Sequence, residues 1–325
     1  MVSSSVRMGS GRRLENHRES LMIALPPVTT LCSFVEQSSG RLSGEVIVWS
    51  TESVAGRVRA LVPWEVTTEA PALTRSTAWL LAVGGGTLLD KAKVLRSHHP
   101  HVNLAALPTL WGSGAEASPI AVLNEDGRKV IRTGPELLPN LIVSHPAFAH
   151  SLPDKFIKYA CGDAWSHALE GFLSPLGTDE SRADLADVLR RMLQQPLSYT
   201  PEWFELSALA CAAQSKTSVG VAHGIAHVLE GVMSWGHARL CSHYLLPAMS
   251  FNKANSPKWP LLAASGLPDN AIFMLLHTLF DNEAYLATLP ALTSNWSKVL
   301  RDKCTRTNPA LIRPQDLEFF TSFRA

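Results

Sequence analysis

Cysteine, net charge and long apolar runs are all scarce in this sequence. Its five cysteines, Cys32, Cys161, Cys211, Cys241 and Cys304, are scattered and form no CxxC pair, which excludes a disulfide framework and argues against sulfur as a metal ligand. No run of about 18 apolar residues occurs, so no membrane-spanning helix is predicted. The formal net charge of +1 gives no general attraction to nucleic acid or anionic membranes. We therefore expect a cytoplasmic protein that binds neither of them.

Length and composition indicate a globular chain with two domains. The 325 residues are 46% hydrophobic and 18% charged, enough apolar material for two sizeable cores. Residues 1–20 are rich in serine, glycine and arginine and are predicted to form a disordered leader. An export signal is disfavoured because acidic residues follow Arg12 and Arg13 and prolines end the apolar stretch early. We place the first domain at residues 21–150 and the second at residues 151–325.

The first domain contains strands that run into glycine turns. An apolar, β-branched stretch over residues 45–50 reads as a buried parallel strand, and a second strand is predicted over residues 79–83. The second strand leads into Gly84, Gly85, Gly86 and Thr87 and then into a segment with helical spacing. Glycines allow close backbone approach, and free N–H groups at a helix start face an anion, so this arrangement is typical of phosphate binding.

A second turn follows a further strand. Residues 103–107 read as a strand that opens into Thr109, Leu110 and Ser113 within the segment PTLWGSG. Both turns are expected at the carboxyl edge of one sheet, where open α/β sheets bind nucleotides. A hairpin is predicted over residues 120–131 and another short strand over residues 141–143. Glycine turns alone also occur as ordinary turns, so this signal is weak by itself.

Helical periodicity dominates from about residue 151 onward. The second domain is therefore predicted to be all-helical. The predicted helices span residues 154–173, 181–193, 203–217, 221–229, 237–251, 270–280 and 315–323.

Two groups of potential metal ligands lie on these helices. Asp163 and His167 are four residues apart, as are His223 and His227, and His237 follows ten residues later. Residues four apart share a helix face, so a carboxylate and up to three imidazoles can converge on a divalent metal with one position left open. A single such pair is more often an ordinary surface or core feature, but two pairs with a follower seldom arise by chance. Spacing alone does not decide among the three later histidines.

Five motifs carry a resemblance to a known family. The segments GGGTLLDKAK, PTLWGSGAE, GDAWSHALE, HGIAHVLEGVMSWGH and CTRTNPALIRPQDLE resemble, in order, motifs of the iron-containing (group III) alcohol dehydrogenases. For the fourth segment the family pattern is HxxAHxLGxxxxxxH. The resemblance extends from about residue 44 to the C-terminus. It implies a Rossmann-like dinucleotide-binding α/β domain followed by an all-helical domain, a dehydroquinate synthase-like fold.

The resemblance also implies roles for individual residues. Asp163, His167, His223 and His237 would bind Fe(II), with Zn(II) as the alternative, and His227 would be a proton relay rather than a ligand. NAD or NADP would bind in the cleft between the domains, and a homodimer is the family expectation. The residues expected at the cofactor are Gly84, Gly85, Gly86, Thr87, Asp90, Thr109, Leu110, Ser113 and Lys129.

Several positions depart from the family pattern. Ser50 stands where an acidic residue often holds the adenosine ribose, which leaves NADP open, and Leu110 replaces the second threonine of PTT. The segment between Trp49 and Gly84 is shorter than in the family, and the helical domain is also trimmed. The metal site is therefore better supported than the adenosine side of the nucleotide site.

The sequence thus predicts a metal-dependent oxidoreductase. It would transfer hydride between NAD(P) and a small alcohol, aldehyde, ketone or hydroxy acid, and the trimmed domains suggest a specialised biosynthetic substrate. One variant is oxidation of a β-hydroxy acid with loss of CO₂. The alternatives are a metal-dependent lyase or hydrolase without nicotinamide, and a non-catalytic binding protein that has lost its cofactor site.

Overall fold

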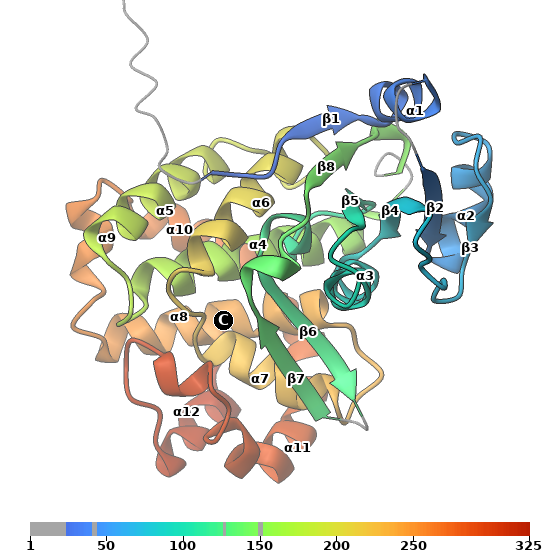
Figure 1. The fold of residues 1–325 in the computed structure, drawn as a ribbon. Helices are drawn as coiled ribbons and strands as arrows, with labels where there is room; N and C mark the ends of the chain where they lie inside the picture. The colour runs from blue at the N-terminus through green and yellow to red at the C-terminus, as the bar shows by residue number, and fades with distance from the viewer. Residues whose placement is uncertain (1–23, 41–43, 126–127, 149–151) are drawn as a thin grey trace, which may run out of the picture.

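The computed structural model describes residues 24–40, 44–125, 128–148 and 152–325. The predicted leader, residues 1–20, lies outside the described residues. Figure 1 shows the strands gathered on one side of the molecule and the long helices on the other. This arrangement confirms the predicted fold class, an α/β domain with a parallel sheet followed by a helical domain. No described helix combines the length and apolarity needed to cross a bilayer.

A parallel sheet of six strands forms the first part of the fold. Its order is β1-β8-β5-β4-β2-β3, so the two strands that precede the glycine turns, β4 and β5, are neighbours. Their carboxyl ends meet at one sheet edge, as predicted. No bounds were predicted for strands β1 and β3, because they are only three and two residues long. The bounds are β1 (Val28–Thr30), β2 (Glu45–Ser50), β3 (Val66–Thr67), β4 (Thr77–Gly84), β5 (Asn103–Pro108) and β8 (Leu141–Ser144).

Both faces of this sheet are buried. In β4, Leu81 and Val83 belong to the core under α1 and α2, whereas Leu80 and Ala82 belong to the core under α3. Burial on both faces explains why these strands read as continuous apolar runs. The helices are α1 (Leu31–Gly40), α2 (Glu52–Arg59) and α3 (Gly86–Ser97). The predicted hairpin is confirmed as antiparallel β6 (Ile120–Glu125) and β7 (Arg128–Thr133), which projects toward α7 in Figure 1.

Helix α4 (Asp154–Leu173) is the central element of the helical part. It packs against α5, α6 and α8, and its residues from Ala160 to Leu173 are all buried. Its bounds match the prediction, whereas α9 and α11 were not predicted. The remaining helices are α5 (Asp179–Met192), α6 (Glu202–Gln214), α7 (Val221–Glu230), α8 (His237–Asn255), α9 (Pro260–Ala264), α10 (Asp269–Leu279), α11 (Asn282–Val299) and α12 (Leu317–Ser322).

Gly114 allows the turn after β5 to pack directly on α6. Its φ is +57°, and an added Cβ would clash with Cys211 Cβ and would lie 2.8 Å from the Ser207 carbonyl oxygen. We expect Gly114→Ala to lower the free energy of unfolding by about 2–4 kcal/mol, because the new methyl meets backbone that cannot move and the conformation itself is strained. Chemical denaturation of the metal-free protein measures this change.

Gly56 supplies the matched control. It lies in α2, where an added Cβ has nothing within 4 Å. Gly56→Ala should therefore raise stability by about 0.5–1 kcal/mol, the ordinary helix-propensity difference. Equal effects of the two substitutions would contradict the proposed packing of Gly114.

Candidate metal and nucleotide site

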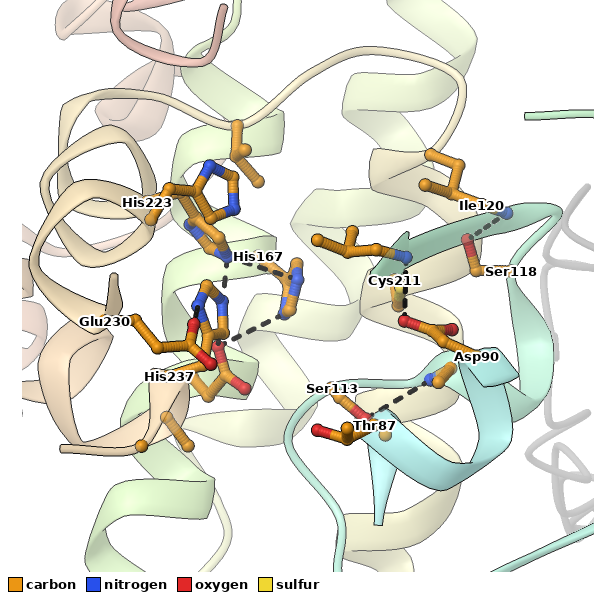
Figure 2. Close-up of a pocket in the computed structure, with 18 of the residues that line it drawn as sticks. Thr87, Asp90, Ser113, Ser118, Ile120, His167, Cys211, His223, Glu230 and His237 are labelled. Atoms are coloured by element: carbon orange, nitrogen blue, oxygen red, sulfur yellow. Dashed lines mark hydrogen bonds and ion pairs between the residues drawn. The ribbon is translucent and has the colours of Figure 1, made fainter. Parts of the chain in front are cut away.

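One cavity of about 740 Å³ lies between the sheet edge and the helices. Its walls include the start of α3, the β6–β7 hairpin and parts of α4, α7 and α8. In Figure 2 the histidines lie on one side of the cavity, across from Thr87, Ser113 and Asp90. The structure thus places the two sequence features, the histidine groups and the first glycine turn, in a single cavity.

Three predicted metal ligands, Asp163, His223 and His237, have ligand atoms within 4.8 Å of one another in this cavity, and the fourth, His167, contacts His223. Asp163 and His167 come from α4, His223 from α7, and His237 is the first residue of α8. His223 Nε2 lies 3.2 Å from His167 Nε2 and 3.8 Å from Asp163 Oδ1, and His237 Nε2 lies 3.9 Å from the same oxygen. Ligand atoms of a tetrahedral metal site with bonds near 2.1 Å are separated by about 3.4 Å, so the spacing fits such a site.

An unsatisfied polar atom supports the same conclusion. Asp163 Oδ1 is buried and has no hydrogen-bond partner among the described residues, and Asp163 is only 1% exposed. A buried polar atom without a partner is costly, so this oxygen needs a ligand. Burial lowers the pKa of His167, and it lowers that of His223 well below the usual value, helped by the neighbouring imidazoles. Both rings are therefore neutral, the form that can donate a lone pair to a metal.

Two glutamates that the sequence analysis did not identify hold the histidines in place. The imidazole N–H at His223 Nδ1 donates to Glu170 Oε2 at 2.7 Å, and His237 Nδ1 lies 3.4 Å from Glu230 Oε2. Each contact fixes the tautomer and directs Nε2 toward the ligand cluster, the usual second layer of a histidine metal site. Glu170 stood in the same motif as His167, and Glu230 occupies the position of glycine in HxxAHxLGxxxxxxH.

The two glutamates differ in their electrostatics. Burial raises the pKa of Glu170 to about 7, although three backbone N–H groups oppose the rise. Burial also favours the neutral form of Glu230, but His237 and Lys129 outweigh it and lower its pKa to about 2. The pKa of His237 is raised, because Glu230 and Asp163 outweigh the opposing effect of burial.

We expect Glu170→Gln to weaken metal binding about 10- to 100-fold without unfolding the protein. The amide keeps the shape of the side chain, but it no longer supplies the negative oxygen that polarises His223 Nδ1–H. Competition with a fluorescent chelator measures the change in affinity. Glu180→Gln is the control, because Glu180 is exposed on α5 and its 3.9 Å ion pair with Lys216 lies at the surface. Wild-type affinity in Glu170→Gln would exclude the proposed orienting role.

Cys241 brings a sulfur close to the predicted metal ligands, which the sequence analysis did not anticipate. It lies four residues after His237 on α8, and its Sγ is 3.4 Å from His237 Nε2. Single ligand atoms from Asp163, His223, His237 and Cys241 all lie within 4.8 Å of one another. Burial raises the pKa of the Cys241 thiol well above the usual value, with the Asp163 and Glu170 carboxylates adding to the effect. Counting only CxxC pairs overlooked this single cysteine at helical spacing.

His227 lies beside the cluster rather than in it. Its ring stacks on His237 with centroids 5.3 Å apart, and its Nδ1 lies 3.4 Å from Asp302 Oδ2 and 3.8 Å from Cys304 Sγ. Burial favours the neutral form of Asp302, but the hydrogen bond and charge of His227, with two backbone donors, lower its pKa. The structure therefore gives His227 a carboxylate partner of its own.

The start of α3 is the side of the cavity that suits a phosphate. Gly85, Gly86 and Thr87 line it, and the helix has no side-chain cap at its first N–H groups. Leu110 and Ser113 also line the cavity. Gly84 and Thr109 do not line it, and instead the Thr109 N–H donates to the Gly84 carbonyl at 3.1 Å.

Two predicted cofactor residues also have protein partners. Asp90 lines the cavity, but its Oδ1 pairs with Lys93 at 3.0 Å and its Oδ2 accepts from the Val122 N–H at 2.9 Å. Lys129 lines it as well and forms a 2.9 Å ion pair with Glu230, which joins the hairpin to α7. Ser50 is fully buried and its hydroxyl donates to the Thr51 carbonyl. Asp90 and Lys129 therefore also hold the cavity walls together.

Fold and site together define a two-domain protein with a candidate metal centre beside a candidate nucleotide site. The family model described as iron-containing alcohol dehydrogenase matches residues 53–146. Maleylacetate reductase 2 of Cupriavidus pinatubonensis is 31% identical over 187 residues, 55% of this chain and 52% of the relative. Maleylacetate reductase 1 of Rhodococcus opacus is 28% identical over 316 residues, 87% of this chain and 83% of the relative. The first alignment therefore spans only about half of that reductase.

A solved structure shows the same fold. The iron-containing alcohol dehydrogenase from Corynebacterium glutamicum superposes with a TM-score of 0.70 at 18% identity, over 91% of this chain and 94% of that chain. The resemblance to the iron-containing alcohol dehydrogenases that the motifs indicated is therefore confirmed, and the chain is a divergent relative of that family.

Proposed function

We propose that this protein is an NAD(P)-dependent, metal-dependent oxidoreductase that interconverts an alcohol and an aldehyde or ketone. One observation carries the proposal: the four ligand residues and the uncapped start of α3 face the same cavity. Family membership supports it, since this family uses NAD(P) and a divalent metal. Fe(II) is the family metal, and the Asp-His₃ donor set suits Zn(II) as well.

The bound groups would supply the two hard parts of the reaction. A divalent metal polarises a C–O bond as a Lewis acid, and a nicotinamide gives or accepts hydride. The chain's own residues would position them. Asp163 and the three ligand histidines would bind the metal, Glu170 and Glu230 would orient the rings, and the α3 start would hold the diphosphate.

His227 would carry the proton between the substrate oxygen and solvent. It lines the main cavity and also a second cavity of about 280 Å³, whose other walls include Asp302 and Lys298. A side chain shared by two cavities can accept a proton on one side and release it on the other. Asp302 would stabilise the imidazolium that forms and keep the ring oriented.

The trimmed domains and altered cofactor positions favour a specialised biosynthetic substrate. Oxidation of a β-hydroxy acid, followed by loss of CO₂ from the β-keto product, is a variant of the same chemistry. Release of CO₂ during turnover distinguishes this variant from simple oxidation.

A nicotinamide titration tests the proposal. Anaerobically iron-loaded protein is titrated with NADH and with NADPH while nicotinamide fluorescence is followed, alongside Asp163→Ala. Micromolar binding of either nucleotide, together with metal-dependent absorbance change on adding carbonyl compounds, supports the proposal. Failure of both nucleotides to bind at one metal per chain would refute it, and metal-dependent activity without nicotinamide would then indicate a lyase or hydrolase.

A further inference from the structure

The cavity contains a guanidinium that has no acidic partner among the residues that the structure describes. Arg239 lies two residues after His237 in α8 and lines the cavity. In the described part of the chain, no carboxylate lies within 4.0 Å of it, and its Nε donates to His243 Nε2 at 3.5 Å. Its two terminal nitrogens keep their N–H groups free of protein hydrogen bonds within those same residues.

Aromatic rings hold this guanidinium in a fixed orientation. Arg239 Cζ lies 3.4 Å from the ring centroid of Trp235 and 5.7 Å from that of Tyr159. Stacking on a ring face fixes the plane of a guanidinium and leaves its N–H edge available, the geometry that binds a carboxylate through two parallel hydrogen bonds. The arrangement therefore presents a preorganised anion receptor rather than a flexible surface cation.

The receptor lies close to the candidate metal centre. Lys155, Tyr159, Asp163 and His167 are spaced by four residues along α4, and all four line the cavity. They form one stripe on α4. Along the helix axis, Tyr159 lies about 6 Å before the ligand Asp163, and Lys155 lies about 12 Å before Asp163. Arg239 lies two residues after the ligand His237 on α8 and contacts the Tyr159 ring of α4, so both helices that hold the guanidinium also carry metal ligands.

We propose that Arg239 binds a carboxylate of the substrate, so that the substrate is a short hydroxy acid or oxo acid rather than a neutral alcohol or aldehyde. Because Arg239 and the ligand residues line the same cavity, one short substrate can present its carboxylate to the guanidinium and its reacting oxygen to the metal site. Lys155, exposed at the outer end of the stripe, adds a second positive charge that attracts the same anion. This proposal rests on the proposed function, whose substrate class it specifies.

Two matched pairs of probes test it. Succinate semialdehyde and butanal have the same chain length and differ in the carboxylate, and both are assayed with the iron-loaded holoenzyme. We expect Arg239→Gln to lower kcat/KM for succinate semialdehyde about 10- to 100-fold, mainly through KM, and to change that for butanal less than about threefold. Arg239→Lys should recover part of the loss, since lysine restores the positive charge but cannot donate the two parallel hydrogen bonds of a guanidinium.

A binding measurement provides a readout independent of turnover. Calorimetric titration of metal-loaded protein with succinate should show binding that weakens about 10- to 100-fold in Arg239→Gln, whereas 1,4-butanediol should bind weakly to both. Arg190→Gln is the control and should match the wild type, because Arg190 is exposed on α5, where it pairs with Asp187 at 3.0 Å. Circular dichroism and melting of each variant verify that it is folded.

The outcomes separate the two proposals. Equal kcat/KM for the two aldehydes in the wild type, or unchanged succinate binding in Arg239→Gln, would overturn the carboxylate site. Weaker NADPH binding with unchanged succinate binding would show that Arg239 serves the cofactor phosphate, which also overturns it. Absence of nicotinamide binding refutes the oxidoreductase function, yet Arg239-dependent succinate binding would still establish the anion site.

Discussion

Replacing His223 with alanine is expected to abolish metal binding and, with it, all oxidoreductase activity. His223 is 2% exposed, its Nε2 faces Asp163 and His167, and its Nδ1 is held by Glu170. Loss of this imidazole removes one donor and leaves Glu170 without its partner, so affinity should fall by at least about a thousandfold, more than the loss of an outer partner alone. Metal analysis after gel filtration should find less than about one-tenth of an equivalent per chain.

His277→Ala is the matched control for this experiment. His277 is an exposed histidine on α10 that does not line the cavity, so its variant should keep full metal content and rate. Circular dichroism and a melting curve of the metal-free proteins separate ligand loss from unfolding. One metal per chain in His223→Ala would show that the cluster around Asp163 is not the metal site.

Replacing His227 with alanine is expected to lower kcat about 10²- to 10⁴-fold while the metal stays bound. His227 is outside the ligand cluster but touches it through His237, and Asp302 lies on its other side. Its removal should interrupt proton transfer without removing a donor to the metal. Stopped-flow measurement of nicotinamide absorbance gives the rate, and metal analysis of the same sample gives the content.

Asp302→Asn refines the interpretation of this result. The amide keeps a contact with His227 but loses the charge that would stabilise the imidazolium, so the rate should fall less than in His227→Ala. A small primary amine or imidazole added to His227→Ala should restore part of the rate if the lost function is proton transfer. A wild-type rate in His227→Ala would show that His227 is not the proton relay.

The sequence allowed the strands and most helices to be predicted where the local pattern is strong. Residues 45–50 and 79–83 are continuous apolar runs because both faces of the sheet are buried. Helix α11 was not predicted, since Pro290 interrupts its interior and only a few of its positions are buried. Strands β1 and β3 are too short for any period to be recognised.

Spacing within a helix decides which residues share a face, and that much came from the sequence. Asp163 and His167, like His223 and His227, were expected on common faces, and the glycine turn after β4 was expected to open a helix. The resemblance to the family motifs then distinguished the expected metal ligands from His227, the expected proton relay. These are local properties, fixed by the helical period and by the freedom of glycine.

Only the tertiary structure decided which side chains meet, because α4, α7 and α8 converge through long-range packing that no local period encodes. It placed Glu170 behind His223 and Glu230 behind His237, brought the Cys241 sulfur to the cluster, and gave His227 the distant partner Asp302. It also left Arg239 stacked on Trp235 without an acidic partner among the described residues, although the sequence shows it only as one more charge on a helix. Charge balance and donor geometry are properties of neighbours in space, and some neighbours in this site are as distant in the chain as Lys129 of the hairpin and Glu230 of α7.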